Sequence, residues 1–334
     1  MKQHVSQRLR RLAAPVCPRA MGVAGLCLLI TLLGGGGSAA ASIHQVAIVI
    51  SRPLEPYQQA ADGIVEALSE LRDEVAIDRY MVRGGSDEPD ALAEKIHRRG
   101  TELLFAVGTD AYRELSERLP NLPMMISMVY DPLQEFNLAD APDVYGAHLR
   151  VPFTDQFAVY RQFLPAIDRI SLIYMEEQED ALTPELREGA RRAGLEVVPI
   201  PLGSTSELEP ALARARSEGQ AFLMVLDKAI YTAAATSKIL LFFARSQTPV
   251  YSFSPNVVKA GALISVSASF RSNGVTAGKL GVRVLTRVPI EQRFIPTEEL
   301  CIAWNETAAR ALRIELPDEM RQRCDLIYGT ESGR

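Results

Sequence analysis

The sequence lacks the motifs of the common enzyme classes. It contains no G-x-S-x-G nucleophile elbow, no Walker loop and no G-x-G-x-x-G after a strand pattern. Beyond residue 41 it has only three scattered histidines and two cysteines, with no CxxC pair, so we expect no zinc site. These absences predict a protein that is not an enzyme and that carries no cofactor or metal.

Positive charge is also scarce outside the N-terminus. Residues 1–41 hold five basic and no acidic side chains. The other 293 residues therefore have 31 basic against 41 acidic side chains, a net charge of −10. A surface this acidic disfavours the binding of a polyanion, so we expect no nucleic-acid partner.

The N-terminal residues form a pattern of their own. A basic stretch precedes an apolar run over 21–33, and the small residues Ser-Ala-Ala-Ala follow over 38–41. This order is typical of a secretory signal peptide over residues 1–41, with Ser42 as the first residue of the mature chain. The apolar run is shorter than the roughly 20 residues that a permanent span needs, and an uncleaved N-terminal anchor is the alternative. We therefore expect an exported, periplasmic protein.

Export changes the interpretation of the two remaining cysteines. Cys301 and Cys324 are an even number of thiols in an oxidising compartment, which favours a disulfide between them. Two separate buried thiols are the alternative. The sequence does not decide between them.

From residue 43 onward, apolar runs of five to seven residues alternate with amphipathic stretches. The run over 45–50 predicts a strand, and the helical spacing over 55–71 predicts a helix after it. Four glycines stand at the end of a helix pattern, immediately before a strand pattern. Glycine there suits the left-handed conformation that ends a helix: Gly100, Gly194, Gly219 and Gly261. The strand patterns are apolar throughout, as in a parallel sheet covered on both faces. The sequence thus predicts an α/β fold.

An irregular stretch over 131–142 interrupts this alternation. A new strand pattern over 144–149 then leads into a helix pattern over 153–164. We interpret the break as a division into two doubly wound, parallel-sheet lobes, with the first crossing near Leu149. Ligands of such sheets bind outside the carboxyl ends of the strands, so a cleft between the lobes is the expected site.

Several side chains follow directly after predicted strands and are candidates for that site. Thr109 opens a helix whose free N–H groups suit a carboxylate or another anion, although capping alone explains it equally well. Asp131 precedes a proline, where turn chemistry is the alternative. Asp227 follows a wholly apolar run and suits a ligand ammonium group, with an ion pair to Lys228 as the alternative. The remaining candidates are expected to supply walls and hydrogen bonds: Tyr57, Tyr130, Ser252 and Phe270.

Several stretches resemble the substrate-binding proteins of bacterial ABC transporters, in the uncharacterised and aromatic-amino-acid-type group. They are FAVGTDA over 105–111, PMMISMVYDP over 123–132, PVYSFSPNVVKAGALISV over 249–266, the glycine-containing helix with Gly274, Gly278 and Gly281, and a closing helix over 302–316. The resemblance covers residues 43–320. It differs at Arg52-Pro53, where that family usually has His-Pro.

The resemblance implies the type I periplasmic binding protein fold, with three crossovers between the lobes. Lobe 1 would then comprise 42–148 plus about 262–291, and lobe 2 would comprise 149–261 plus about 292–334. It implies a monomer that closes on a small solute, such as an amino acid, and delivers it to an ABC permease in the inner membrane. The alternative is an envelope sensor or scaffold that uses the same cleft to signal to a membrane partner.

Overall fold

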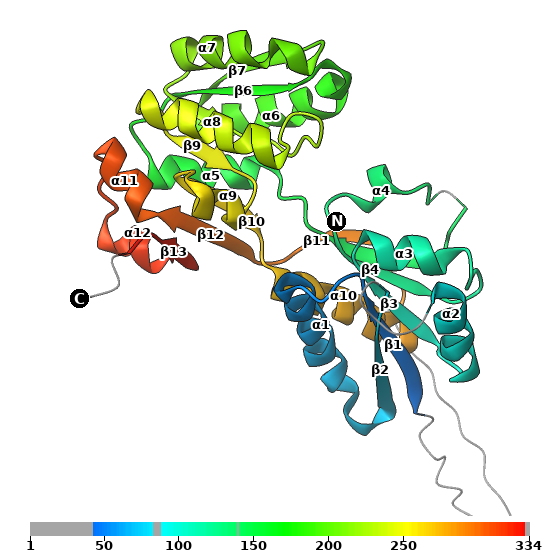
Figure 1. The fold of residues 1–334 in the computed structure, drawn as a ribbon. Helices are drawn as coiled ribbons and strands as arrows, with labels where there is room; N and C mark the ends of the chain where they lie inside the picture. Colours follow the sequence, from blue (N-terminus) through cyan, green and yellow to red (C-terminus); the bar gives the residue numbers. More distant parts are fainter. Residues whose placement is uncertain (1–42, 83–87, 139, 331–334) are drawn as a thin grey trace, which may run out of the picture. The chain divides into compact units, whose positions relative to one another are not determined.

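The computed structural model describes residues 43–82, 88–138 and 140–330, which form two α/β lobes (Figure 1). The predicted signal peptide over residues 1–41 lies outside the described residues. Within the described ranges, no helix combines the length and the apolar character that a bilayer crossing requires.

The first lobe is built on a six-stranded parallel sheet. Its strands are β1 (His44–Ile50), β2 (Val75–Met81), β3 (Leu103–Val107), β4 (Met124–Val129), β5 (Val144–His148) and β11 (Phe294–Pro296). Its helices are α1 (Glu55–Leu68), η1 (Ser69–Glu74), α2 (Pro89–Arg98), α3 (Thr109–Ser116), α4 (Pro132–Glu135) and α10 (Phe270–Leu285). The strand order is β11-β5-β4-β3-β1-β2.

The second lobe is built on a seven-stranded sheet. Its strands are β6 (Arg169–Met175), β7 (Glu196–Leu202), β8 (Ala221–Leu223), β9 (Val250–Ser252), β10 (Ile264–Ala268), β12 (Leu300–Asn305) and β13 (Leu326–Tyr328). Its helices are α5 (Phe153–Phe163), η2 (Glu176–Gln178), α6 (Glu179–Ala193), η3 (Thr205–Glu207), α7 (Leu208–Glu218), α8 (Ala233–Arg245), α9 (Pro255–Ala260), α11 (Glu306–Leu312) and α12 (Asp318–Gln322). The order is β13-β12-β10-β9-β8-β6-β7, and only the β10–β12 pair is antiparallel.

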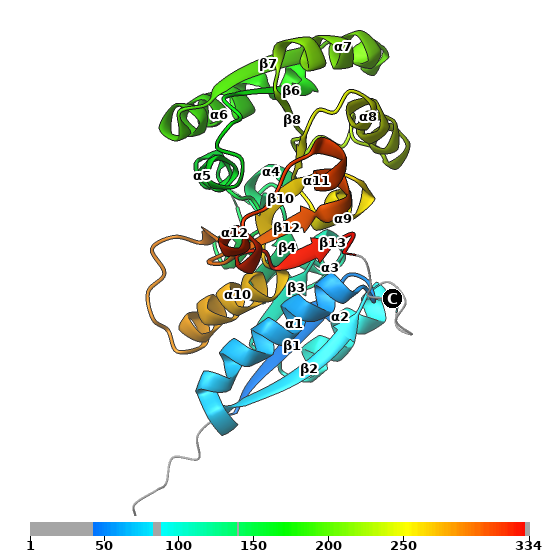
Figure 2. The same ribbon diagram turned by 90° about the vertical axis from the view of Figure 1, so that its left-hand side faces the viewer.

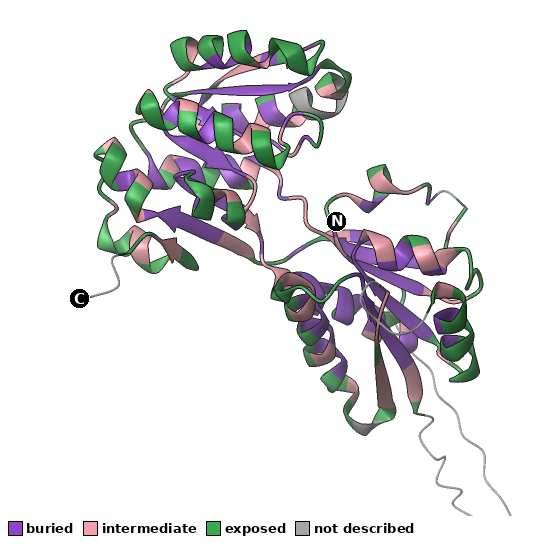
Figure 3. Ribbon diagram, viewed as in Figure 1, coloured by how far each residue is buried: buried purple, intermediate pink, exposed green. Residues whose placement is uncertain are grey.

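Each sheet is covered by helices on both faces, as the apolar strand patterns predict. In β1, Val46 and Ile48 pack against the α1 and α10 side, whereas Ala47 and Val49 pack against the α2 and α3 side. Figure 3 shows mostly buried strands and helices whose outward faces are exposed. Alternate residues of one strand therefore enter two different cores, so both faces of β1 carry apolar side chains.

The second and third crossings between the two sheets come later in the chain than the family resemblance implies. Residues from about 262 to 291 were expected to belong to lobe 1, but β10 pairs with β9 and β12 in the second sheet. The chain joins the first lobe only with α10, and it leaves after Pro296, the end of β11. The prediction differs because it treated β10 and α10 as one unit of one lobe. The partner of a strand cannot be inferred from the strand's own apolar pattern.

Helices α1 and α10 lie side by side on the first sheet (Figure 2). Glycine permits this approach: a Cβ atom added at Gly274 would lie 1.9 Å from the carbonyl oxygen of Ala60. A Cβ atom added at Gly63 would lie 2.2 Å from the carbonyl oxygen of Arg271. Contact between the two backbones therefore excludes any side chain at these positions.

Most local features agree with the sequence predictions, but the helix predicted over 55–71 ends at Leu68 and two further features differ. Gly100, Gly194 and Gly261 have positive φ angles where helices end, as expected, but Gly219 is extended with φ −109°. Gly219 is required instead by a close approach, because an added Cβ atom would lie 2.5 Å from Ser171 Oγ. The closing helix expected over 302–316 begins only at Glu306, because the preceding residues pair with β10 as β12.

The two cysteines lie on neighbouring segments of the second sheet. Cys301 belongs to β12 and Cys324 precedes β13, and the parallel register pairs Ala303 with Leu326. The structure describes both thiols as free, and burial raises the pKa of each to about 11. The Cys301–Cys324 disulfide stays a prediction, and alkylation of the non-reduced protein would test it.

Candidate functional site

A cavity of about 480 Å³ lies at the carboxyl ends of strands from both sheets, and we call it the interlobe cleft. The first lobe contributes Tyr130, Asp131, Gln134 and Glu135. The second lobe contributes residues that follow β6, β8 and β9 and residues of α5 and α6. They include Phe153, Glu177, Glu185, Asp227, Lys228 and Phe253, together with Met175 at the end of β6 and Arg150 at the first crossover. The location agrees with the general position of ligands in open α/β sheets.

On the first lobe, Asp131 shapes its wall of the cleft. Its Oδ1 accepts hydrogen bonds from the backbone N–H groups of Leu133 (3.2 Å) and Gln134 (3.3 Å), and it thereby caps α4. Pro132 occupies the first turn, where its missing N–H group costs nothing. The short helix places Gln134 and Glu135 in the cavity. Asp131 is thus a turn residue and a cleft residue at once.

The strand end that carries Tyr130 and Asp131 is held by a buried side chain of α10. Asn273 Oδ1 accepts hydrogen bonds from Ser127 Oγ (2.7 Å) and from the backbone N–H of Met128 (2.8 Å). Its Nδ2 donates to the carbonyl of Ala147 (3.1 Å) and to Thr297 Oγ1 (2.9 Å). Met128 has φ +59°, and the β4–β5 register shifts there. Asn273 therefore stabilises an irregular strand end directly before the cleft residues.

On the second lobe, Asp227 has the corresponding position after β8. It is 2% exposed, and its carboxylate accepts three backbone N–H groups: Met175 (3.1 Å), Ala229 (2.9 Å) and Ile230 (3.3 Å). These bonds connect the end of β6 to the turn after β8. Burial, with the Asp227 charge nearby, raises the pKa of Tyr231, whose hydroxyl donates to the carbonyl of Ile173. The buried charge of Asp227 is thus compensated by backbone dipoles.

Lys228 does not pair with Asp227. Its Nζ lies 3.3 Å from Glu135 Oε2 on the first lobe, although the Lys228 side chain is 81% exposed. Arg113 also reaches Glu135, at 2.5 Å. Arg150, at the first crossover, pairs with Glu185 and lies 3.9 Å from Asp131 Oδ2. Both cationic side chains of the cleft therefore have carboxylate partners.

The cleft has an excess of negative charge and three aromatic rings. Its carboxylates are Asp131, Glu135, Glu177, Glu185 and Asp227, against the two cations Arg150 and Lys228. Tyr130 and Phe253 contribute rings from the two lobes, together with Phe153 of α5. Carboxylates and aromatic faces both attract a positively charged group.

The structure brings three of the seven predicted ligand residues together. Tyr130, Asp131 and Asp227 line the interlobe cleft, and the other four lie outside it. Thr109 begins α3 after Gly108, and the Ser51 hydroxyl accepts the N–H of Ala111 in that turn at 3.0 Å. The binding roles of all seven remain predictions.

The other three predicted residues, Ser252, Tyr57 and Phe270, also lie outside the cleft. Ser252 is fully buried and its Oγ donates to the carbonyl of Ser254 at 3.2 Å. The ring of Tyr57 lies against Gly108, where an added Cβ atom would come within 2.5 Å of it. Phe270 is the first residue of α10 and is half-buried.

Sequence reasoning missed the residues that follow the first crossover. Arg150 and Phe153 follow Leu149, near which the first crossing between the lobes was predicted. Residues at a crossing lie beside the cleft, so the predicted crossing could have identified them. Asn273 had a weaker signal, an asparagine inside a glycine-containing helix. Glu185 gave none, because an acidic residue on an amphipathic helix is normally solvated.

Three solved structures resemble this chain in fold. The ABC domain in complex with L-Trp from Streptococcus pneumoniae is 21% identical, with a TM-score of 0.57, and the match covers 86% of this chain and 100% of that one. The ligand-free, open structure of a substrate binding protein with adhesive properties from Clostridium difficile is 17% identical, with a TM-score of 0.69 and coverage of 86% and 100%. A conserved domain protein from Vibrio cholerae is 16% identical, with a TM-score of 0.56 and the same coverage.

Sequence comparison gives the family directly. No curated protein matches the chain. The family described as ABC transporter substrate binding protein matches residues 45–326, which is most of the chain. A cavity at the strand ends of α/β sheets is a common location of small-molecule sites. This chain therefore belongs to the ABC transporter substrate binding protein family.

Proposed function

We propose that the chain is an exported, monomeric binding protein that holds a small solute in the interlobe cleft and delivers it to an ABC permease. The observation that carries this proposal is the composition of the cleft, whose walls come from both lobes. A solute that contacts both walls favours the state in which the lobes are closed, because only that state offers all the contacts.

The charges of the cleft favour a solute with a protonated amine. Arg150 and Lys228 are already paired with carboxylates, so neither is free to bind an acid group without losing a partner. Glu177, the cleft carboxylate without a hydrogen bond or ion pair to any described residue, and the rings of Tyr130 and Phe253 would instead stabilise a cation. The structure from Streptococcus pneumoniae contains L-Trp, which makes indole compounds suitable first probes.

The test compares three compounds that share the indole ring: tryptamine, L-tryptophan and indole-3-propionate. Thermal shift and calorimetry of the purified protein should show tryptamine binding more tightly than indole-3-propionate by at least about tenfold. Native mass spectrometry of protein from its host would identify the physiological solute. Tighter binding of the acid would contradict the amine preference, and no small molecule under any condition would contradict the proposed function.

A matched pair of variants locates the binding. Tyr130→Ala should weaken binding by at least about tenfold, because it removes an aromatic wall of the cleft. Leu133→Ala is the control, since Leu133 lies three residues away, is 60% exposed and does not line the cavity. Equal loss in both variants would show that the solute binds elsewhere.

A further inference from the structure

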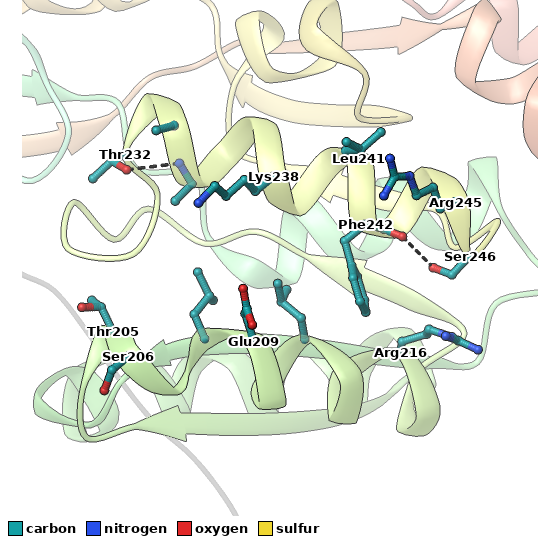
Figure 4. Close-up of a pocket in the computed structure, with 14 residues that line it drawn as sticks. Thr205, Ser206, Glu209, Arg216, Thr232, Lys238, Leu241, Phe242, Arg245 and Ser246 are labelled. Carbon is teal, nitrogen blue, oxygen red and sulfur yellow. Dashed lines mark hydrogen bonds between the residues drawn. The ribbon is translucent and has the colours of Figure 1, made fainter.

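A second cavity, of about 1060 Å³, lies between α7 and α8 on the second lobe, and we call it the outer groove (Figure 4). The two helices run in the same direction, so their N-terminal residues Thr205 and Thr232 lie at one end. Arg216 and Arg245 lie at the other end. The cleft residues described above take no part in this groove.

The walls of the outer groove are more apolar than packing on the sheet requires. On α8, Ile239, Leu240 and Phe243 already face the core. Leu241, which is 51% exposed, adds an apolar side chain that the core does not cover, and Phe242, which also packs against that core, points from α8 toward α7. Leucines of α7 form the opposite wall. An apolar stripe wider than the core contact is typical of a helix that packs on a further partner.

The groove also contains cations that nothing in the described part of the chain satisfies. Arg216, Lys238 and Arg245 are exposed, and no hydrogen bond or ion pair joins them to any described residue. Arg214, two residues before Arg216 on α7, is paired with Glu218 at 2.6 Å. The single acid of the groove, Glu209, leaves it with a net positive charge. This is the reverse of the acidic body around it.

From these observations we infer that the outer groove is a docking site for an acidic amphipathic helix of a protein partner. Helices α7 and α8 have 11 and 13 residues, about 17 and 20 Å at 1.5 Å per residue, which suits a partner helix of three to four turns. Its apolar face would contact Leu241 and Phe242 between the walls. Its acidic residues would pair with Arg216 and Arg245 at one end and with Lys238 near the middle.

Two other occupants fit the charges less well. A second copy of the chain brings a body of net charge −10 toward another of the same sign, which opposes association at long range. A membrane surface is broad, whereas the apolar residues lie between two helices, and anionic lipids would be repelled by the acidic body. A narrow acidic segment would contact only the groove, where three cations face one acid, and the repulsion from charges more than about 10 Å away is largely screened by salt.

The test uses a labelled synthetic peptide of about 14 residues, three to four helical turns, with leucines at i, i+3, i+4 and i+7 spacing and glutamates between them. A second peptide has lysines in place of the glutamates. Fluorescence anisotropy with the purified protein should show the glutamate peptide binding at least about tenfold more tightly. Equal binding of the two peptides, or none up to about 1 mM, would overturn the inference.

Variants show whether the peptide occupies the groove. Arg216→Glu combined with Arg245→Glu should weaken binding at least about tenfold, and Leu241→Ser should also weaken it. The matched controls are Arg214→Glu on the same helix and Leu54→Ser at another half-exposed leucine, which should remain within about twofold of the unmodified protein.

Parallel measurements decide between the occupants. Sedimentation should show a monomer whose mass the Arg216→Glu, Arg245→Glu variant leaves unchanged, and vesicles containing phosphatidylglycerol should not bind. A dimer that this variant disrupts would replace the inference with self-association. Vesicle binding that this variant abolishes would replace it with a membrane surface. Controls that lose peptide binding as strongly as the groove variants would also overturn it.

Discussion

The interlobe cleft and the outer groove differ in how their charged side chains are used. In the cleft, Arg150 and Lys228 pair with carboxylates, and Asp227 is held by three backbone N–H groups. In the groove, Arg216 and Lys238 have no partner among the described residues. Paired charges fix the geometry of a site before anything binds, whereas unpaired charges are available to an incoming molecule.

This difference predicts opposite responses to mutation. Removing a charged residue of the cleft should lower the free energy of unfolding, because a hydrogen-bonded partner is left behind. Removing a charged residue of the groove should leave stability nearly unchanged and should alter only binding. Stability measurements on single variants therefore test whether the charges of the cleft and of the groove differ in this way.

The largest effect is expected for Asp227→Ala. The change leaves the N–H groups of Met175, Ala229 and Ile230 without their acceptor at a position that is 2% exposed. We expect the free energy of unfolding of the second lobe to fall by about 3 kcal/mol, since hydrogen bonds to a charged group contribute about 1.5–3 kcal/mol. Urea denaturation followed by circular dichroism measures it.

Asp131→Ala is the matched control, because Asp131 also follows a strand at the cleft. It caps the short α4 through two N–H groups, and loss of such a cap costs about 1 kcal/mol. Asp227→Ala should thus destabilise the protein clearly more than Asp131→Ala. Similar small losses in both would mean that Asp227 is not the buried structural charge that the hydrogen bonds indicate.

The next effect depends on pH and concerns His148, at the end of β5. Burial lowers its pKa below 6.5, an effect that nearby Asp131 only partly offsets, and its Nδ1 is buried without a hydrogen-bond partner among the residues that the structure describes. As the pH falls through 6.5, His148 therefore binds a proton in the unfolded chain before it does so in the folded protein. The stability that His148 contributes is present above pH 6.5 and is lost as pH falls below it, by at most about 1.4 kcal/mol per pH unit.

Urea denaturation near pH 7.5 and pH 5.5 measures this effect against a His148→Asn variant, which cannot titrate. The unmodified protein should lose more stability on acidification than the variant does. The same pH dependence in both proteins would show that His148 is protonated as easily when folded as when unfolded.

Much of the fold could be predicted because it depends on local patterns. The apolar run predicted as a strand over 45–50 became β1 with the same last residue, and the α/β alternation follows from helix and strand periodicity alone. The lobe boundaries could not be predicted as well. The position of β10 depends on its pairing with β9 and β12, and that pairing is made by residues distant in the sequence.

The candidate site could be predicted where it follows strand ends. Tyr130, Asp131 and Asp227 were identified because a polar or aromatic residue directly follows an apolar run. Glu185 could not be, since its place in the cleft depends on how α6 packs beside the first crossover. The roles of Asp227 and Asn273 in holding strand ends also required the hydrogen bonds, which no spacing in the sequence reveals.

A smaller effect is expected for Arg150→Gln. The change removes the pair with Glu185 and the weaker contact with Asp131, but the arginine side chain is 37% exposed, so water screens both. We expect a loss of about 1 kcal/mol in urea denaturation. Binding of tryptamine should be retained or strengthened, because the cleft becomes more negative. Loss of tryptamine binding would contradict the electrostatic account of the cleft.

The smallest effect is expected for Lys238→Gln, in the middle of α8. Arg216 and Arg245 lie in the last turns of their helices, where a positive charge interacts favourably with the helix dipole by about 0.3–1 kcal/mol, so their replacement has a small cost even without a partner. Lys238 has no partner in the described part of the chain and lies away from both ends of its helix. Its replacement should change the free energy of unfolding by less than about 0.5 kcal/mol while weakening the acidic peptide. A loss above about 1 kcal/mol would show that Lys238 stabilises the fold, and the contrast between the groove and the cleft would no longer hold.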